Sequence, residues 1–161
     1  MNVLRWGALL LLTLSLANCA KDDDDDPFAL EGPGGINMND MAGNWVAQEA
    51  VFSRLAGGPA SSIDVVELGG GLSMAIQADG RFTVTLILPD GSSETSTGRM
   101  GFFEDILNIS FDDDPEEWES YAYELDEPNL TIEGGPVYEA IDFDSDGVAE
   151  DANISLYLIR D

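Results

Sequence analysis

The chain has 161 residues with 6 basic and 32 acidic side chains, and its net charge of −26 argues against partners held through phosphates, such as nucleic acid. It contains no histidine, which excludes a Ser-His-Asp or Cys-His catalytic unit and a histidine-ligated metal. Its single cysteine, Cys19, excludes an internal disulfide framework and a multi-cysteine metal cluster, so an ordinary hydrophobic core must stabilise the fold.

The N-terminal segment has the pattern of an export signal. Arg5 precedes an apolar run over residues 6–16, which is too short to span a bilayer as a permanent helix. The run ends in Leu16-Ala17-Asn18-Cys19, which resembles the lipobox of bacterial lipoproteins. That resemblance implies a signal peptide over residues 1–18, a diacylglycerol on the Cys19 sulfur and a place in the bacterial cell envelope, on the outer membrane. A secretory signal without lipidation is the alternative.

Residues 19–36 are predicted to form a tether. A run of consecutive aspartates over residues 22–26 is followed by a stretch rich in proline and glycine, and this composition cannot bury a core. The aspartates could instead bind cations, but nothing in the sequence fixes their geometry. We therefore interpret them as a solvated spacer between the lipid anchor and the domain that follows.

Residues 37–161 are predicted to form one all-β domain. Short segments rich in β-branched and aromatic residues alternate with Gly, Asp, Asn and Pro, and no long helical period occurs. Glycine-containing turns at 78–80 and 89–91 favour hairpins, so consecutive strands should be antiparallel. The predicted strands cover residues 45–53, 72–77, 81–88, 93–100, 106–111, 118–125, 129–133, 137–143 and 153–160.

The predicted strands favour an antiparallel up-and-down β-barrel of about eight strands, because closure removes the exposed edges of an open sheet. A two-sheet β-sandwich is the alternative. The glycine-rich segment 56–71 has no clear period and would cover one open end of a barrel. We interpret it as an irregular surface loop, with a lid over a ligand mouth as the other reading.

Gly43-Asn44-Trp45, which opens the first predicted strand, resembles the G-x-W signature of lipocalins. In that family the tryptophan plugs the closed end of an eight-stranded barrel, and an arginine near the end of the last strand packs across its indole. Arg160 has that position here. Together with the lipobox, the pattern is similar to that of bacterial lipocalin-like lipoproteins, and it implies a barrel closed by Gly43, Trp45 and Arg160.

The resemblance implies non-catalytic binding by a monomer. The sequence contains no nucleophile elbow, phosphate loop or cofactor fingerprint, so we do not expect an enzyme. In one reading the barrel interior receives a small apolar ligand; in the other the interior is a filled core, and the outer surface binds a protein or a polysaccharide. The residues expected to line the interior are Phe82, Val84, Leu86, Ile109 and Tyr121.

An acidic loop near the C-terminus matches the first nine positions of a D-x-D-x-D-G calcium loop. Alternate side chains supply hard oxygen ligands, and Gly147 permits the sharp turn. Position 12 is asparagine, and strands flank the loop, so it resembles the loops of extracellular β proteins. We expect a structural calcium ion with a Kd on the order of 10⁻⁴ M, with an ordinary acidic turn as the alternative. The predicted ligands are Asp142, Asp144, Asp146, the Val148 carbonyl, Glu150 and Asn153.

Overall fold

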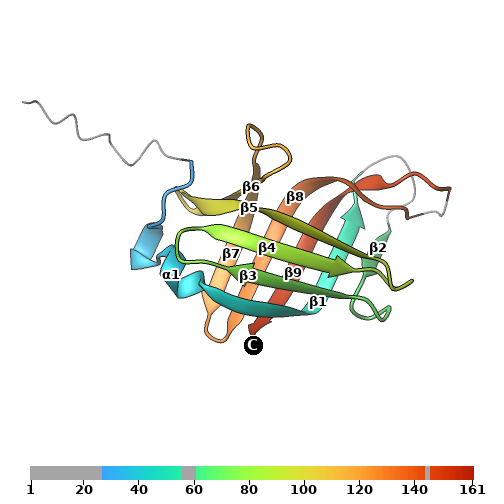
Figure 1. Ribbon diagram of the computed structural model, residues 1–161, viewed down its shortest axis with the longest axis horizontal. Coiled ribbons are helices and arrows are strands. Elements are labelled where there is room, and N and C mark those ends of the chain that lie inside the picture. The colour runs from blue at the N-terminus through green and yellow to red at the C-terminus, as the bar shows by residue number, and fades with distance from the viewer. Residues whose placement is uncertain (1–26, 56–60, 144–145) are drawn as a thin grey trace, which may run out of the picture.

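The computed structural model describes residues 27–55, 61–143 and 146–161 (Figure 1). The predicted signal peptide, Cys19, the aspartate run and Asp144 lie outside the described residues. Within these ranges, no helix combines the length and the apolar character that crossing a membrane requires.

The strands close into an antiparallel up-and-down barrel, as predicted. β9 pairs back onto β1, with Trp45 opposite Arg160 at one end and Arg54 opposite Ala152 at the other, so every wall strand has two neighbours. The wall consists of β1 (Gly43–Arg54), β3 (Gly71–Ile76), β4 (Arg81–Ile87), β5 (Ser93–Phe103), β6 (Ile106–Phe111), β7 (Glu119–Asp126), β8 (Asn129–Ile141) and β9 (Glu150–Arg160).

Alternation along the strands sorts side chains between the interior and the solvent. On β3, Leu72, Met74 and Ile76 are buried while Ser73 and Ala75 are exposed, which is the pattern of a half-buried strand. The barrel interior is therefore an apolar core. Its largest fully buried side chains include Trp45, Phe102, Met38, Met41, Met100, Leu107, Leu130, Ile132 and Leu158.

Among the residues that the structure describes, two short helical segments lie before the first strand. They are η2 (Pro33–Gly35) and α1 (Met38–Met41), and Figure 1 shows α1 and β2 (Ser62–Asp64) toward opposite ends of the barrel. Asn37 and Asp40 form a capping box at the start of α1, in which the Asn37 N–H donates to the Asp40 carboxylate over 2.9 Å. Because Met38 and Met41 are fully buried, α1 covers the barrel end at which Trp45 lies.

Part of the predicted tether packs on the barrel. Ala29 exchanges two backbone hydrogen bonds with Phe102, of 3.1 and 2.7 Å, and Phe28 is only 8% exposed. These bonds satisfy backbone groups of β5 beyond the point where its pairing with β4 ends. A Cβ at Gly101 would lie 2.4 Å from the Phe28 backbone, so this close approach depends on glycine. Residues 27–36 therefore belong with the barrel rather than with a solvated spacer.

Two predicted boundaries also differ. The predicted strands 129–133 and 137–143 are one strand, β8, whose pairing with β9 shifts register between Gly134 and Val137. Gly134 has a φ of +151°, which other residues rarely adopt, so the glycines mark an irregularity inside a strand and not a turn. The predicted irregular segment 56–71 contains β2, which pairs with the second half of β1, and Val65, which is fully buried.

Candidate functional site

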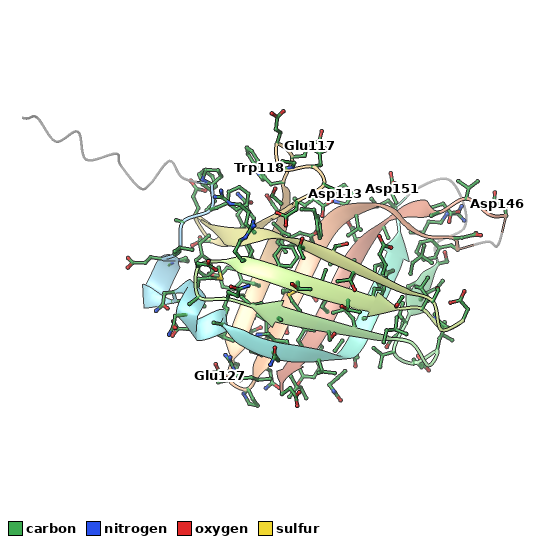
Figure 2. The ribbon with its side chains drawn as sticks, in the orientation of Figure 1. Asp113, Glu117, Trp118, Glu127, Asp146 and Asp151 are labelled. Atoms are coloured by element: carbon green, nitrogen blue, oxygen red, sulfur yellow. The ribbon has the colours of Figure 1, made fainter. Side chains whose placement is uncertain are left out.

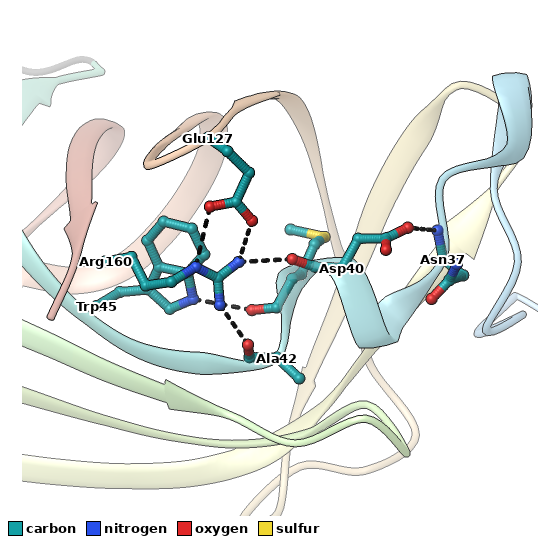
Figure 3. Close-up of polar contacts among 7 residues, drawn as sticks. Asn37, Asp40, Ala42, Trp45, Glu127 and Arg160 are labelled. Carbon is teal, nitrogen blue, oxygen red and sulfur yellow. Dashed lines mark hydrogen bonds and ion pairs between the residues drawn. The ribbon is translucent and has the colours of Figure 1, made fainter.

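Trp45 and Arg160 lie together at the closed end of the barrel (Figure 3). The indole of Trp45 is fully buried, and its Nε1–H donates to the Met41 carbonyl of α1 over 2.8 Å. The Arg160 guanidinium carbon lies 4.3 Å from the centre of the Trp45 ring, which is the geometry of a cation–π contact. The structure thus brings together the tryptophan of the G-x-W pattern and the arginine of the last strand.

The Arg160 guanidinium also ties three chain segments together. It donates to the backbone carbonyls of Asp40 and Ala42, just before β1, and forms an ion pair with Glu127 in the turn between β7 and β8. A Cβ at Gly43 would lie 2.5 Å from an Arg160 nitrogen, and Gly43 has a φ of +149°. Glycine is therefore required at the first position of the pattern for both space and backbone conformation.

The interior of the barrel contains a cavity of about 200 Å³. The lining of the cavity includes Leu72, Leu86 and Glu94. Leu86 on β4 pairs with Leu72 on β3 and with Glu94 on β5, at the ends of these strands that are farther from Trp45. The volume is below the range of about 300 to 1,000 Å³ that is typical of drug-sized ligands, and it equals that of about seven water molecules. The cavity is therefore smaller than a typical site for a drug-sized ligand.

All five residues predicted to line the interior do line this cavity: Phe82, Val84, Leu86, Ile109 and Tyr121. The cavity is also lined by residues that were not predicted: Phe52 on β1, Leu156 on β9, and the polar pair Glu94 and Ser96 on β5. The pairing register supplies the missing information, because Glu94 stands opposite Leu86 and Ser96 opposite Val84, so all four side chains share the inner face.

A surface hollow of about 460 Å³ adjoins the cavity where β6 and β7 separate. These strands pair only from Leu107 opposite Tyr121 to Ile109 opposite Glu119. The hollow and the cavity share four lining residues, so the hollow reaches the interior from the side of the barrel. Those residues are Ser96, Ile109, Phe111 and Val137.

Glu119 and Tyr121 lie where the hollow meets the cavity. Tyr121 lines the cavity, Glu119 lines the hollow, and the Tyr121 hydroxyl donates a hydrogen bond to the Glu119 carboxylate. Burial raises the pKa of Glu119, against the opposing effect of the tyrosine hydrogen bond. Burial, with the hydrogen bond to Glu119, also raises the pKa of Tyr121, which therefore keeps its proton.

The loop between β6 and β7 carries an acidic and aromatic rim. Figure 2 shows Asp113, Glu117 and Trp118 on this loop, and all three line the hollow. Trp118 is 51% exposed, and its ring meets the edge of Phe28 with a centroid separation of 6.1 Å. The segment that carries Tyr121 thus begins at an exposed aromatic residue.

The acidic loop after β8 is held by its own backbone. The carboxylate of Asp142 accepts hydrogen bonds from the N–H groups of Asp146 and Gly147, at 3.2 and 2.8 Å, and Asp146 accepts from Val148 at 2.9 Å. Val148 is exposed, and Asn153 lies on β9 opposite Ser53. These bonds fold the chain around the first and fifth positions of the predicted calcium loop.

The carboxylate of Glu150 has other partners in this structure. One oxygen pairs with the Arg54 guanidinium, and the other accepts a hydrogen bond of 2.7 Å from the Phe143 N–H. Within the described residues, no group of three or more Asp, Glu, His or Cys side chains has the arrangement to hold a metal ion. Asp144, the predicted third-position ligand, lies outside those residues.

No family model matches the sequence, and no curated protein matches it. The fold is similar to the crystal structure of a lipocalin-like protein from Bacteroides uniformis ATCC 8492, with a TM-score of 0.42 and 15% sequence identity. The match covers 76% of this chain and 99% of that chain. The likeness is one of fold alone.

Proposed function

We propose that the chain is a lipid-anchored, lipocalin-like lipoprotein whose barrel binds a small, largely apolar ligand without catalysis. The cavity carries this proposal. It lies in a barrel closed at one end by Trp45 and Arg160, is lined mostly by apolar side chains, and reaches the exposed Glu94 at the other end. A closed floor and an accessible apolar interior are what a ligand-binding barrel needs.

The volume of about 200 Å³ sets the size of the ligand. Since a methylene group and a water molecule occupy similar volumes, the cavity accommodates an alkyl chain of about seven carbons. Burying a chain of that length contributes roughly 5 to 6 kcal/mol, from which the cost of immobilising the ligand is subtracted.

A surface interaction is the second candidate function. Trp118 is 51% exposed on the loop between β6 and β7, next to acidic side chains. Exposed aromatic residues are typical of surfaces that bind proteins or polysaccharides. In this reading the interior acts only as a core, and binding does not depend on the cavity.

Filling the cavity separates the two candidates. We expect Val84→Trp, which directs an indole into the interior, to weaken binding of 1-octanol at least 10-fold in isothermal titration calorimetry of the full chain. Thr85→Trp is the matched control, because Thr85 is the next residue on β4 and its hydroxyl bonds to that of Thr95 on the exposed face. It should bind like the unmodified protein.

Both variants must show a cooperative thermal transition for the comparison to hold. Equal affinities in the two variants would mean that octanol binds elsewhere, and the absence of any octanol binding would favour the surface interaction.

The membrane anchor is tested at the lipobox cysteine. Because the sulfur of Cys19 would carry the diacylglycerol, Cys19→Ser should abolish the incorporation of labelled palmitate in a bacterial host and move the protein from the membrane to the soluble fraction. Incorporation that persists in the variant would contradict lipidation at this residue.

We also propose that the acidic loop binds calcium in a structural role. The carboxylates of Asp142 and Asp146 already accept loop N–H groups, which leaves oxygen lone pairs for a hard cation. With a Kd on the order of 10⁻⁴ M, 10 mM calcium should stabilise the fold by about 2.7 kcal/mol and raise its melting temperature.

Asp142→Asn tests the calcium site, because it keeps an acceptor for the loop but removes the charge. It should reduce the calcium-induced rise in melting temperature, measured against EDTA. Asp126→Asn, at the end of β7, removes the same charge elsewhere and should leave the rise intact. A rise of equal size in both variants would place the calcium effect outside this loop.

A further inference from the structure

The opening between β6 and β7 is acidic. Asp113, Asp114, Glu117 and Glu119 line the hollow, and Glu94 lines the adjoining cavity. No lysine or arginine is found among the described residues that line either space. The charged side chains that line the two spaces are therefore all acidic among the described residues, and this favours positively charged ligands over anions.

None of the four described arginines lines the hollow or the cavity. Arg54 pairs with Glu150, Arg81 with Asp112, and Arg160 with Glu127. Arg99 lies over the ring of Phe28, with its guanidinium carbon 4.0 Å from the ring centre. None of the four lines the hollow, so the acidic groups there have no lining arginine to neutralise them.

Glu119 and Tyr121 define what a ligand must offer at the junction. The phenol has a single O–H, and it already donates that group to Glu119. The carboxylate and the phenolic oxygen therefore present only acceptor sites to a ligand. Because Glu119 is partly buried, its charge is poorly solvated, which raises its pKa and makes a positively charged partner favourable.

We propose that this site binds an amphiphilic cation, with its alkyl chain in the barrel cavity and an ammonium group at Glu119. The inference rests on the proposed ligand-binding function and specifies the chemical class of that ligand. An ammonium donates hydrogen bonds to the Glu119 carboxylate and the Tyr121 oxygen, and the exposed ring of Trp118 at the rim of the hollow offers a cation–π surface. The chain length follows from the cavity volume.

Three probes of eight carbons each test the proposal: octylammonium, 1-octanol and octanoate, each titrated calorimetrically into the full chain at pH 7 and about 0.15 M salt. We expect octylammonium to bind at least 10-fold more tightly than octanol, and octanoate to bind most weakly. Octylammonium and octanol have the same alkyl chain, so the difference between them reports the head group; the octanoate chain is shorter by one methylene group, which contributes about 0.8 kcal/mol.

Glu119→Gln removes the charge and keeps an acceptor for Tyr121. It should weaken octylammonium binding at least 10-fold, to the level of octanol, and leave octanol binding within about 2-fold. Glu124→Gln removes one charge from an exposed position on the same strand, β7, and should change neither affinity. If Glu119→Gln fails to melt cooperatively, Asp113→Asn removes a negative charge at the rim of the hollow instead. It should weaken the binding of octylammonium and leave the binding of octanol unchanged.

The outcomes distinguish this inference from the proposed function. Equal binding of octylammonium and octanol, tightest binding of octanoate, or an unchanged octylammonium affinity in Glu119→Gln would overturn the cationic class while the apolar site stands. If none of the three probes binds, the proposed function fails and the inference fails with it.

Discussion

Replacing Trp45 with alanine is expected to lower the free energy of unfolding by about 3 to 5 kcal/mol. The indole is fully buried at the closed end of the barrel, so its removal leaves a cavity between β1, β9 and α1. The change also removes the hydrogen bond to Met41 and the ring surface beneath Arg160. Each of these losses adds to the cost of the cavity.

Urea unfolding followed by circular dichroism measures the effect of the Trp45 substitution. The matched control is Trp118→Ala, which removes the same side chain from a position that is 51% exposed, and we expect it to cost less than about 1 kcal/mol. Similar losses in the two variants would mean that the indole of Trp45 does not fix the closed end of the barrel.

The closed end could be anticipated because Gly43-Asn44-Trp45 and Arg160 resemble the G-x-W pattern and the last-strand arginine of lipocalins. Gly43 and Trp45 are two residues apart, and Arg160 stands near the end of the last strand, which closure of the barrel places beside the first. The interior lining followed from the period of two along single strands, which is why Phe82, Val84 and Leu86 were predicted correctly to share the inner face.

The irregularity in β8 could not be read from the sequence because glycine and proline punctuate both turns and bulges. Gly134, Gly135 and Pro136 fit a turn as well as an interruption within a strand, and pairing with β9 on both sides decides between them. Phe28 was missed for a related reason. A single aromatic residue in a polar, glycine-rich stretch does not reveal that β5 offers it a partner edge.

The sequence contains a signal for the Glu119–Tyr121 pair in the spacing of the two residues. Residues two apart on a strand share a face, so a glutamate at this spacing from an inward tyrosine predicts a carboxylate at the rim of the interior. The separation of β6 from β7 cannot be predicted from the sequence, because this separation depends on where the pairing of the two strands stops. That separation makes the pair a junction between the hollow and the cavity.

Replacing Glu150 with alanine is expected to lower the free energy of unfolding by about 3 kcal/mol, even in EDTA. Its carboxylate pairs with Arg54 and accepts the Phe143 N–H, and the two side chains of the pair are only 17% and 8% exposed. Removal of the carboxylate takes one ion-pair partner from a buried guanidinium, which costs more than breaking a solvated pair.

Three measurements decide how Glu150 acts. Asp112→Ala breaks the ion pair with Arg81, in which the Arg81 side chain is 53% exposed and the Asp112 side chain 45%. This substitution should lower the free energy of unfolding by less than about 1 kcal/mol. Glu150→Gln keeps acceptors for Arg54 and Phe143 and should lose less than Glu150→Ala. If Glu150→Ala destabilises the protein only when calcium is present, its carboxylate acts as a metal ligand. If the loss is the same in EDTA, the carboxylate acts through Arg54, and Glu150 is not a ligand of the proposed calcium site.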